Sequence, residues 1–184
     1  MSTVQQPPVT IAEFEKMRDP ADGSRLELVR GEVVVMPPPK GKHGICCSQI
    51  AWVLNSFVKP KKLGWVTTND TGVVLERGPD TVRGPDVAFW SIKRQPTMPE
   101  GYFVIPPDIA VEVLSPDDRR GDVRAKIKEY VFYSVPLVWL VDPETRTVMV
   151  YRGSMRGTEL DEPDTLDGGD VLPGFSCKVA ELFV

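Results

Sequence analysis

Apolar residues recur along the chain in short alternating runs, and turn residues separate most of these runs. Such runs are typical of β-strands. The segments RLELV and EVVVM flank Arg30-Gly31 and predict a β-hairpin near the N-terminus. Further strands are expected at WVTTND, GVVLERG, VRGPDVAFW, IAVEVLS, LVWLVD and TVMVYRG, of which the last two form a hairpin across the turn PETR.

Three segments favour helices instead. Thr10 and Glu13 have the spacing of a capping box, which predicts a short helix that ends near DPADG. The segment ICCSQIAWVLNSFVK is mostly apolar, so we expect a buried helix there. A charged helix is expected to begin near Gly121 or Asp122. All four tryptophans are assigned to packing: Trp52, Trp65, Trp90 and Trp139.

The order of these elements indicates one mixed α/β or α+β domain over residues 1–184. Residues 1–9 are expected to form a flexible tail, and residues 153–184 form a C-terminal extension with turns and a short terminal helix. The sequence contains no internal repeat and no interdomain linker. A chain of 184 residues is long enough to build a substantial core.

Composition narrows the class of protein. Apolar residues make up 41% and charged residues 26% of the chain, as in ordinary globular proteins. The net charge of −4 argues against a non-specific nucleic-acid coat protein, but it leaves room for an enzyme that acts on nucleic acid. Cys46, Cys47 and Cys177 form neither a disulfide framework nor a CxxC zinc motif. With no secretory signal and no membrane-length apolar run, a cytoplasmic protein is expected.

Two predicted strands each carry one carboxylate inside an apolar run. Alternation places Glu112 on the same face as Ala110, and Asp86 on the same face as Ala88. If the two strands are neighbours, the carboxylates converge, and a divalent cation would relieve their repulsion. Oxygen ligands of this kind suit Mg²⁺ or Mn²⁺. The alternative is structural: Asp86 caps a turn, and Glu112 pairs with an arginine such as Arg83.

The charged helix supplies a candidate cation. Its inward stripe contains Ile127 and Tyr130, and Lys126 lies about 75° from the centre of that stripe at about 100° per residue. Lys128 points toward solvent by the same arithmetic. Lys126 is therefore the lysine better placed to run along the packed surface and bring its ammonium group to the strand ends.

The ordered set Pro85-Asp86, Glu112 and helical Lys126 resembles the PD-(D/E)XK nuclease superfamily. Within that superfamily the chain is most similar to the Uma-two family of restriction-endonuclease-like proteins. The resemblance covers nearly the whole chain, from about Thr10 to Val184. It rests on these segments: RLELVRGEVVVMPPP, DTGVVLERGPDTVRGPDVAF, PPDIAVEVLSPDD, KIKEYVFYSVPLVWLVDP and LPGFSCKVAELF.

The resemblance implies a restriction-endonuclease-like core, with a mixed central β-sheet flanked by helices, an N-terminal hairpin and a C-terminal β-hairpin extension. It implies metal-dependent hydrolysis of phosphodiester bonds in DNA. Asp86, Glu112 and the backbone carbonyl of Val113 would hold Mg²⁺ or Mn²⁺. Lys126 would orient water or stabilise charge in the transition state.

Two further residues match family positions. Glu27 matches an acidic position of the opening segment, where it would complete the metal shell, and His43 matches the histidine at the entry to the second helix. A salt bridge for Glu27 and a capping or exposed role for His43 are the structural alternatives. The superfamily pattern would place a lysine at position 114, where this chain has Leu114.

Other acidic residues are assigned to turns or helix ends: Asp80, Asp117, Asp118 and Asp142. The competing function is a non-catalytic nucleic-acid-binding or regulatory protein on the same scaffold, which the missing lysine and the net acidity favour. A third possibility is an interaction protein that dimerises through a sheet edge. A homodimer is also expected of a nuclease that cuts both DNA strands.

Overall fold

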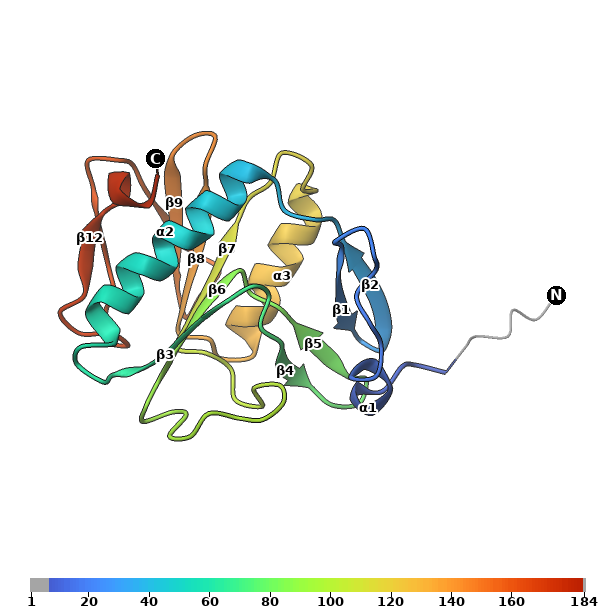
Figure 1. Cartoon of the computed structure of the whole chain (residues 1–184). Coiled ribbons are helices and arrows are strands. Elements are labelled where there is room, and N and C mark those ends of the chain that lie inside the picture. The colour runs from blue at the N-terminus through green and yellow to red at the C-terminus, as the bar shows by residue number, and fades with distance from the viewer. Residues whose placement is uncertain (1–6, 184) are drawn as a thin grey trace.

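A computed structural model describes residues 7–183, and its main body is a mixed β-sheet between two helices (Figure 1). The sheet has six strands in the order β10 (Gly157–Leu160), β9 (Thr147–Arg152), β8 (Leu137–Asp142), β7 (Ile109–Val113), β6 (Val87–Ser91) and β3 (Gly64–Thr68). Strands β7 and β8 run parallel, and every other neighbouring pair is antiparallel. The predicted mixed sheet is therefore confirmed.

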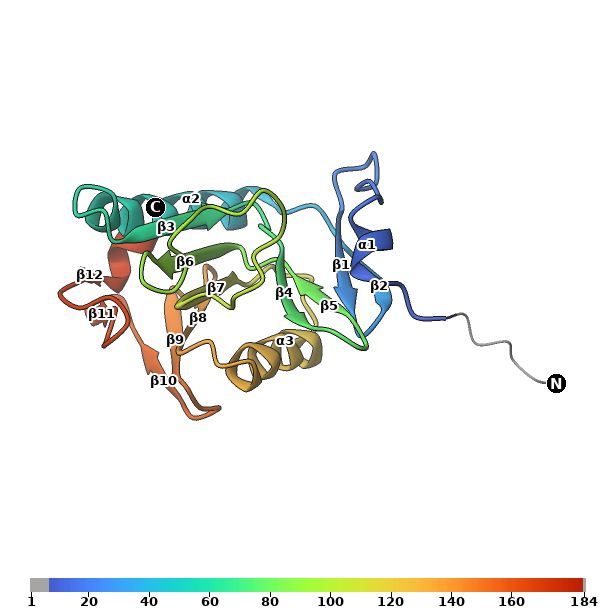
Figure 2. The ribbon, with the colours of Figure 1, turned by 90° about the horizontal axis from the view of Figure 1, so that it is seen from below.

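Helices α2 (Gly41–Val58) and α3 (Arg120–Phe132) cover opposite faces of this sheet, as the view in Figure 2 shows. Alternation along the strands separates two cores. Val87 and Val111 pack with α2, whereas Ala88 and Ala110 pack with Tyr130 of α3. Parallel strands need a crossover connection, and α3 provides the one between β7 and β8. No helix among residues 7–183 combines the length and apolar character needed to cross a bilayer.

A second, antiparallel sheet contains the N-terminal hairpin. Its order is β2 (Glu32–Met36), β1 (Arg25–Val29), β5 (Thr81–Arg83) and β4 (Val73–Glu76). Arg30 and Gly31 turn the hairpin with φ of 51° and 78°, the left-handed values that a tight two-residue turn requires. Helix α1 (Ile11–Phe14) begins with the predicted capping box at Thr10 and packs on this sheet.

The ends of the chain differ in part from the prediction. Of the flexible tail expected at residues 1–9, residues 1–6 lie outside the described part, and the Val9 amide donates to the Gly31 carbonyl at 2.8 Å. The predicted hairpin of β8 and β9 is confirmed. The C-terminal β-hairpin that the family resemblance implies is present as the antiparallel pair β11 (Thr165–Asp167) and β12 (Ser176–Lys178), whereas the short strand β10 was not predicted. The extension ends in the 3₁₀ helix η1 (Val179–Leu182).

One predicted strand is two strands in the structure. VRGPDVAFW is split between β5 and β6, which belong to different sheets, and Gly84, Pro85 and Asp86 connect them. A Cβ on Gly84 would lie 2.6 Å from the carbonyl oxygen of Asp70, so only glycine allows this close approach of two backbones. Pro85 has no amide hydrogen for a sheet ladder. The break places Asp86 directly before β6.

The expectation that the second helix is buried as a whole was wrong, as was the assignment of Trp52 to packing. Helix α2 buries one face, with Ile50 and Leu54 fully covered. Trp52 is 64% exposed on the opposite face. An apolar sequence can therefore form a helix with only one face in the core, because helical geometry turns the remaining positions toward solvent.

The tryptophans provide a matched test of this packing. Trp90 is fully buried, stacks on Phe103 with ring centroids 3.8 Å apart, and donates its indole N–H to the Ile105 carbonyl at 2.7 Å. We expect Trp90→Ala to lower the free energy of unfolding by about 3–5 kcal/mol because it leaves a large cavity. Trp52→Ala should leave the stability nearly unchanged. Urea unfolding followed by circular dichroism measures both, and equal losses would contradict this core assignment.

Candidate active site

The register of the central sheet brings the two predicted carboxylates together. Val87 pairs with Val111 and Ala88 with Ala110, so the same register, continued by one residue, sets Asp86 opposite Glu112. The Asp86 Oδ2 atom accepts a hydrogen bond of 2.7 Å from the Val113 amide. Asp86 therefore lies against the backbone of Val113, the residue whose carbonyl was expected to join the metal shell.

Lys126 reaches the strand ends from α3. Its Nζ atom lies 2.9 Å from Glu112 Oε2, 2.9 Å from Glu27 Oε1 and 3.0 Å from the Gly84 carbonyl. These three acceptors match the three protons of an ammonium group. Lys126 is only 8% exposed, whereas Lys128 is exposed, as the helical geometry predicted. Burial lowers the pKa of Lys126, but the surrounding carboxylates outweigh it and raise the pKa above its usual value.

Glu112 is buried on the α3 side of the sheet. Besides Lys126, it accepts a hydrogen bond of 2.7 Å from the Tyr130 hydroxyl. Burial raises the pKa of Glu112 to about 8, the charges of Asp86 and Glu27 add to the rise, and Lys126 opposes it. Ionisation of Glu112 is thus opposed first by its burial and then by the neighbouring carboxylates. The alternative that Glu112 pairs with Arg83 is wrong, because its ion-pair partner is Lys126.

Glu27 forms a second buried ion-pair centre. Its carboxylate accepts from Lys126, from the Gly84 amide at 2.9 Å and from Arg83 at 2.8 Å. Arg83 also donates to Glu129 of α3 at 2.7 Å. Burial raises the pKa of Glu27, but Lys126 and Arg83 outweigh it, so the pKa lies below its usual value. The structure thus gives Glu27 the salt-bridge role, at a buried position.

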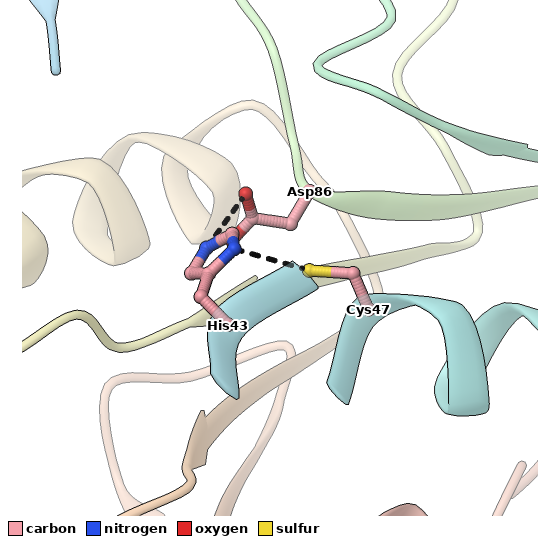
Figure 3. Close-up of side chains that lie close together, drawn as sticks. All are labelled: His43, Cys47 and Asp86. Atoms are coloured by element: carbon pink, nitrogen blue, oxygen red, sulfur yellow. Dashed lines mark hydrogen bonds and ion pairs between the residues drawn. The ribbon is translucent and has the colours of Figure 1, made fainter. Parts of the chain in front are cut away.

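His43 stands in the first turn of α2, next to Asp86 (Figure 3). Its Nε2 atom lies 3.2 Å from Asp86 Oδ1, and its Nδ1 atom lies 3.5 Å from the sulfur of Cys47, one helical turn further on. The side chains of His43 and Asp86 are each 12% exposed. Burial lowers the pKa of His43, but the hydrogen bond to Asp86 and its charge outweigh this and raise the pKa. His43 is therefore neither exposed nor an end cap.

Two residues near this centre were not found from the sequence. Asp70 precedes β4 in a left-handed backbone conformation, with φ of 54°. Burial raises its pKa to about 6, and the charge of Asp86 adds to the rise. Cys47 carried no spacing signal, because its neighbours are His43, four residues before it, and Asp86 at a distant strand end. Nothing in either local sequence indicates these approaches.

The turn assignments of the other acids hold for three residues. Asp80 accepts from the amides of Ile11 and Gly78, Asp118 from that of Ser115, and Asp142 from that of Glu144. Asp117 instead makes an exposed ion pair with Lys40.

A groove of about 1130 Å³ borders the ion pair of Glu112 and Lys126. Glu112 and Lys126 line its floor, and its walls come from the hairpin β1–β2 and from α3. Both signs of charge line the walls, with Arg30, Arg119 and Lys128 against Glu76, Asp122 and Glu129. The groove therefore reaches Glu112, Val113 and Lys126, whereas Asp86 and Glu27 are not among its lining residues.

Comparison with known protein families shows to which family the chain belongs. Residues 11–180 match the model of the Uma2 family, described as "Putative restriction endonuclease". The chain belongs to the Uma2 family. The match covers both sheets and both helices of the site, and it confirms the resemblance drawn from the sequence.

A solved structure supports the Uma2 assignment. The chain is similar to a protein from Anabaena variabilis that is described as "a putative nuclease belonging to DUF820". The identity is 28%, the TM-score is 0.81, and the match covers 96% of this chain and 98% of the other. This likeness identifies the fold as restriction-endonuclease-like. No curated protein matches the chain in sequence.

The buried network predicts a large effect of Lys126. We expect Lys126→Met to lower the free energy of unfolding by about 3–5 kcal/mol, because it leaves Glu27 and Glu112 buried without their shared cation. Lys128→Met, on the exposed side of the same helix, should have no measurable effect. Adding Glu112→Gln to Lys126→Met should recover part of the loss. Guanidinium unfolding measures the stability of all three variants. A small loss of stability in Lys126→Met would show that the residues of the network are weakly coupled.

Proposed function

We propose that this Uma2 protein is a metal-dependent endonuclease that hydrolyses phosphodiester bonds of DNA. The observation that carries the proposal is the position of Lys126, whose buried ammonium group lies 2.9 Å from Glu112 at the strand end where Asp86 also lies. Two carboxylates and one lysine in this arrangement are the residue types that phosphodiester hydrolysis with a metal ion requires.

The donor set fits a hard divalent cation. Asp86, Glu112 and the carbonyl of Val113 would hold Mg²⁺ or Mn²⁺ through oxygen atoms alone. Burial is the first cause of the raised pKa of Glu112, and Asp86 and Glu27 add to it, so a bound cation would stabilise the ionised carboxylate. When bound, the cation supplies an activated water and offsets charge on the phosphate.

The protein groups contribute position and charge. Lys126 orients the attacking water or stabilises the charge that develops on the phosphate. Glu27 and the Gly84 carbonyl hold the ammonium group in place, and the other oxygen of Glu27 is bound by Arg83. We therefore assign Glu27 a positioning role, which replaces the metal-shell role expected from the sequence. His43 holds Asp86 from the α2 side.

The competing function is nucleic-acid binding without cleavage. One observation favours it: all three protons of Lys126 already have acceptors inside the protein, so the network is complete without a substrate. Metal-dependent cleavage separates the two functions, because a binding protein needs no hydrolytic turnover. In both cases DNA is the expected partner, and its affinity should fall with increasing salt.

Plasmid nicking tests the enzyme directly. We expect the wild-type protein to nick supercoiled DNA with Mg²⁺ or Mn²⁺ and to lose this activity in EDTA. Asp86→Asn keeps the shape but removes the charge, so nicking should fall by more than the roughly 10–100-fold seen when a residue that only orients a ligand is lost. Asp80→Asn, in the other Pro-Asp pair of the chain, should retain nicking.

Calorimetry completes that experiment. Mn²⁺ should bind the wild type and Asp80→Asn, and its affinity should be much weaker for Asp86→Asn. A wild type that neither nicks varied DNA nor binds Mg²⁺ or Mn²⁺ would exclude the nuclease and leave the binding protein.

A nuclease that cuts both strands needs two active sites, so a homodimer is expected. Sedimentation equilibrium would show a mass of twice 20.5 kDa. A monomer at all accessible concentrations would contradict the dimer, while nicking of single strands would remain possible.

A further inference from the structure

We propose that His43, Cys47 and Asp86 form a second cation site, suited to a thiophilic divalent ion such as Zn²⁺. One ligand atom from each residue lies within 4.8 Å of the other two. Figure 3 shows the imidazole between the carboxylate and the thiol, with a dashed contact to each. Among the residues that the structure describes, this is the one group of three or more such side chains with this spacing.

The spacing is close to that of a tetrahedral site. Zinc bonds of about 2.0–2.3 Å place neighbouring ligand atoms roughly 3.3–3.6 Å apart. The Nε2 atom of His43 lies 3.2 Å from Asp86, and its other ring nitrogen, Nδ1, lies 3.5 Å from Cys47, so only one of these two distances can separate a pair of metal ligands. The largest separation, 4.8 Å at most, must shorten by roughly 1 Å, and one ring nitrogen must turn toward the common centre. The proposal requires these side chains to rotate, and all three residues are partly buried rather than fully enclosed.

The ligand chemistry separates this site from the one proposed for Mg²⁺. Thiolate and imidazole select zinc and similar transition ions, whereas magnesium prefers an all-oxygen shell. Cys47 is thus the residue that changes the selectivity, and neither the family resemblance nor the proposed nuclease mechanism uses it.

The surroundings favour a cation. Asp70 and Glu112 act electrostatically on both His43 and Cys47, in addition to Asp86 itself. Burial, followed by the charge of Asp86, raises the pKa of the Cys47 thiol. On binding, the S–H bond breaks, the sulfur keeps the electron pair as the metal–sulfur bond forms, and the proton leaves to solvent. No oxidant or reductant is needed.

The two sites share Asp86, and this has a consequence that rests on the proposed function. When Asp86 binds Zn²⁺ together with His43, its carboxylate is no longer available to bind Mg²⁺ together with Glu112. Occupation of the second site therefore inhibits the nuclease, and the protein would respond to thiophilic ions at concentrations below those of its working metal.

Cobalt spectroscopy tests the site without any need for nuclease activity. Co²⁺ is titrated into the protein with a non-thiol reductant present. The wild type should show thiolate-to-cobalt charge-transfer absorption in the near ultraviolet, with visible bands of a tetrahedral ion. Cys47→Ala and Cys47→Ser should abolish the ultraviolet band. Cys46→Ala is the matched control, since Cys46 is the adjacent thiol but lies in the core of the α2 face.

The outcomes are distinguishable. A wild type without the charge-transfer band, or a band that persists in both Cys47 variants, overturns the site. His43→Ala should weaken Co²⁺ binding at least about tenfold if the imidazole is a ligand, and unchanged affinity would also overturn the set. Zn²⁺ should then inhibit wild-type nicking more than Cys47→Ala nicking. Equal inhibition would refute the shared-carboxylate consequence, while loss of all nicking would concern the proposed function and leave the cobalt result standing.

Discussion

The structure depends on a rule about buried charge: an ionised group that leaves water must find partners of opposite charge and enough hydrogen bonds. Lys126 satisfies this rule with Glu112, Glu27 and a backbone carbonyl. Because these acceptors come from β7, from β1 and from the segment after β5, one ammonium group ties α3 to both sheets. Arg83 repeats the connection by joining Glu27 to Glu129. The same contacts hold the fold together and form the site.

Under the proposed function, Lys126 takes the place of the lysine that the superfamily pattern puts at position 114, where this chain has Leu114. A strand lysine would approach Glu112 from the same strand, and its position would follow from the strand alone. Lys126 approaches from a helix, and its long side chain runs through the packed layer before it reaches the carboxylates. The geometry of the site therefore depends on how α3 docks on the sheet, with Ile127 and Tyr130 as its buried contacts.

Strand and helix periodicity made the centre of the site predictable. Alternation set Glu112 on the α3 face, and the angular position of Lys126 selected it over Lys128. The rest depended on information that is not local. Cys47 and Asp70 enter the site through tertiary approach, and the break at Gly84 follows from a backbone contact with Asp70. Trp52 appeared suited to the core by composition, but the helix turned it outward.

The three residues Gly84, Pro85 and Asp86 connect the smaller sheet to the larger one, and Asp86 is the last of them. A fully extended segment of this length spans only about 10 Å, and proline stiffens it further. Any sliding of the smaller sheet would therefore pull on Asp86, which the Val113 amide holds against β7 of the larger sheet. A ligand bound to both Asp86 and Glu112 would fix this end of the connector on the larger sheet, and its binding energy would stabilise the folded position of the connector. The rigidity of this connector would then depend on whether the site is filled.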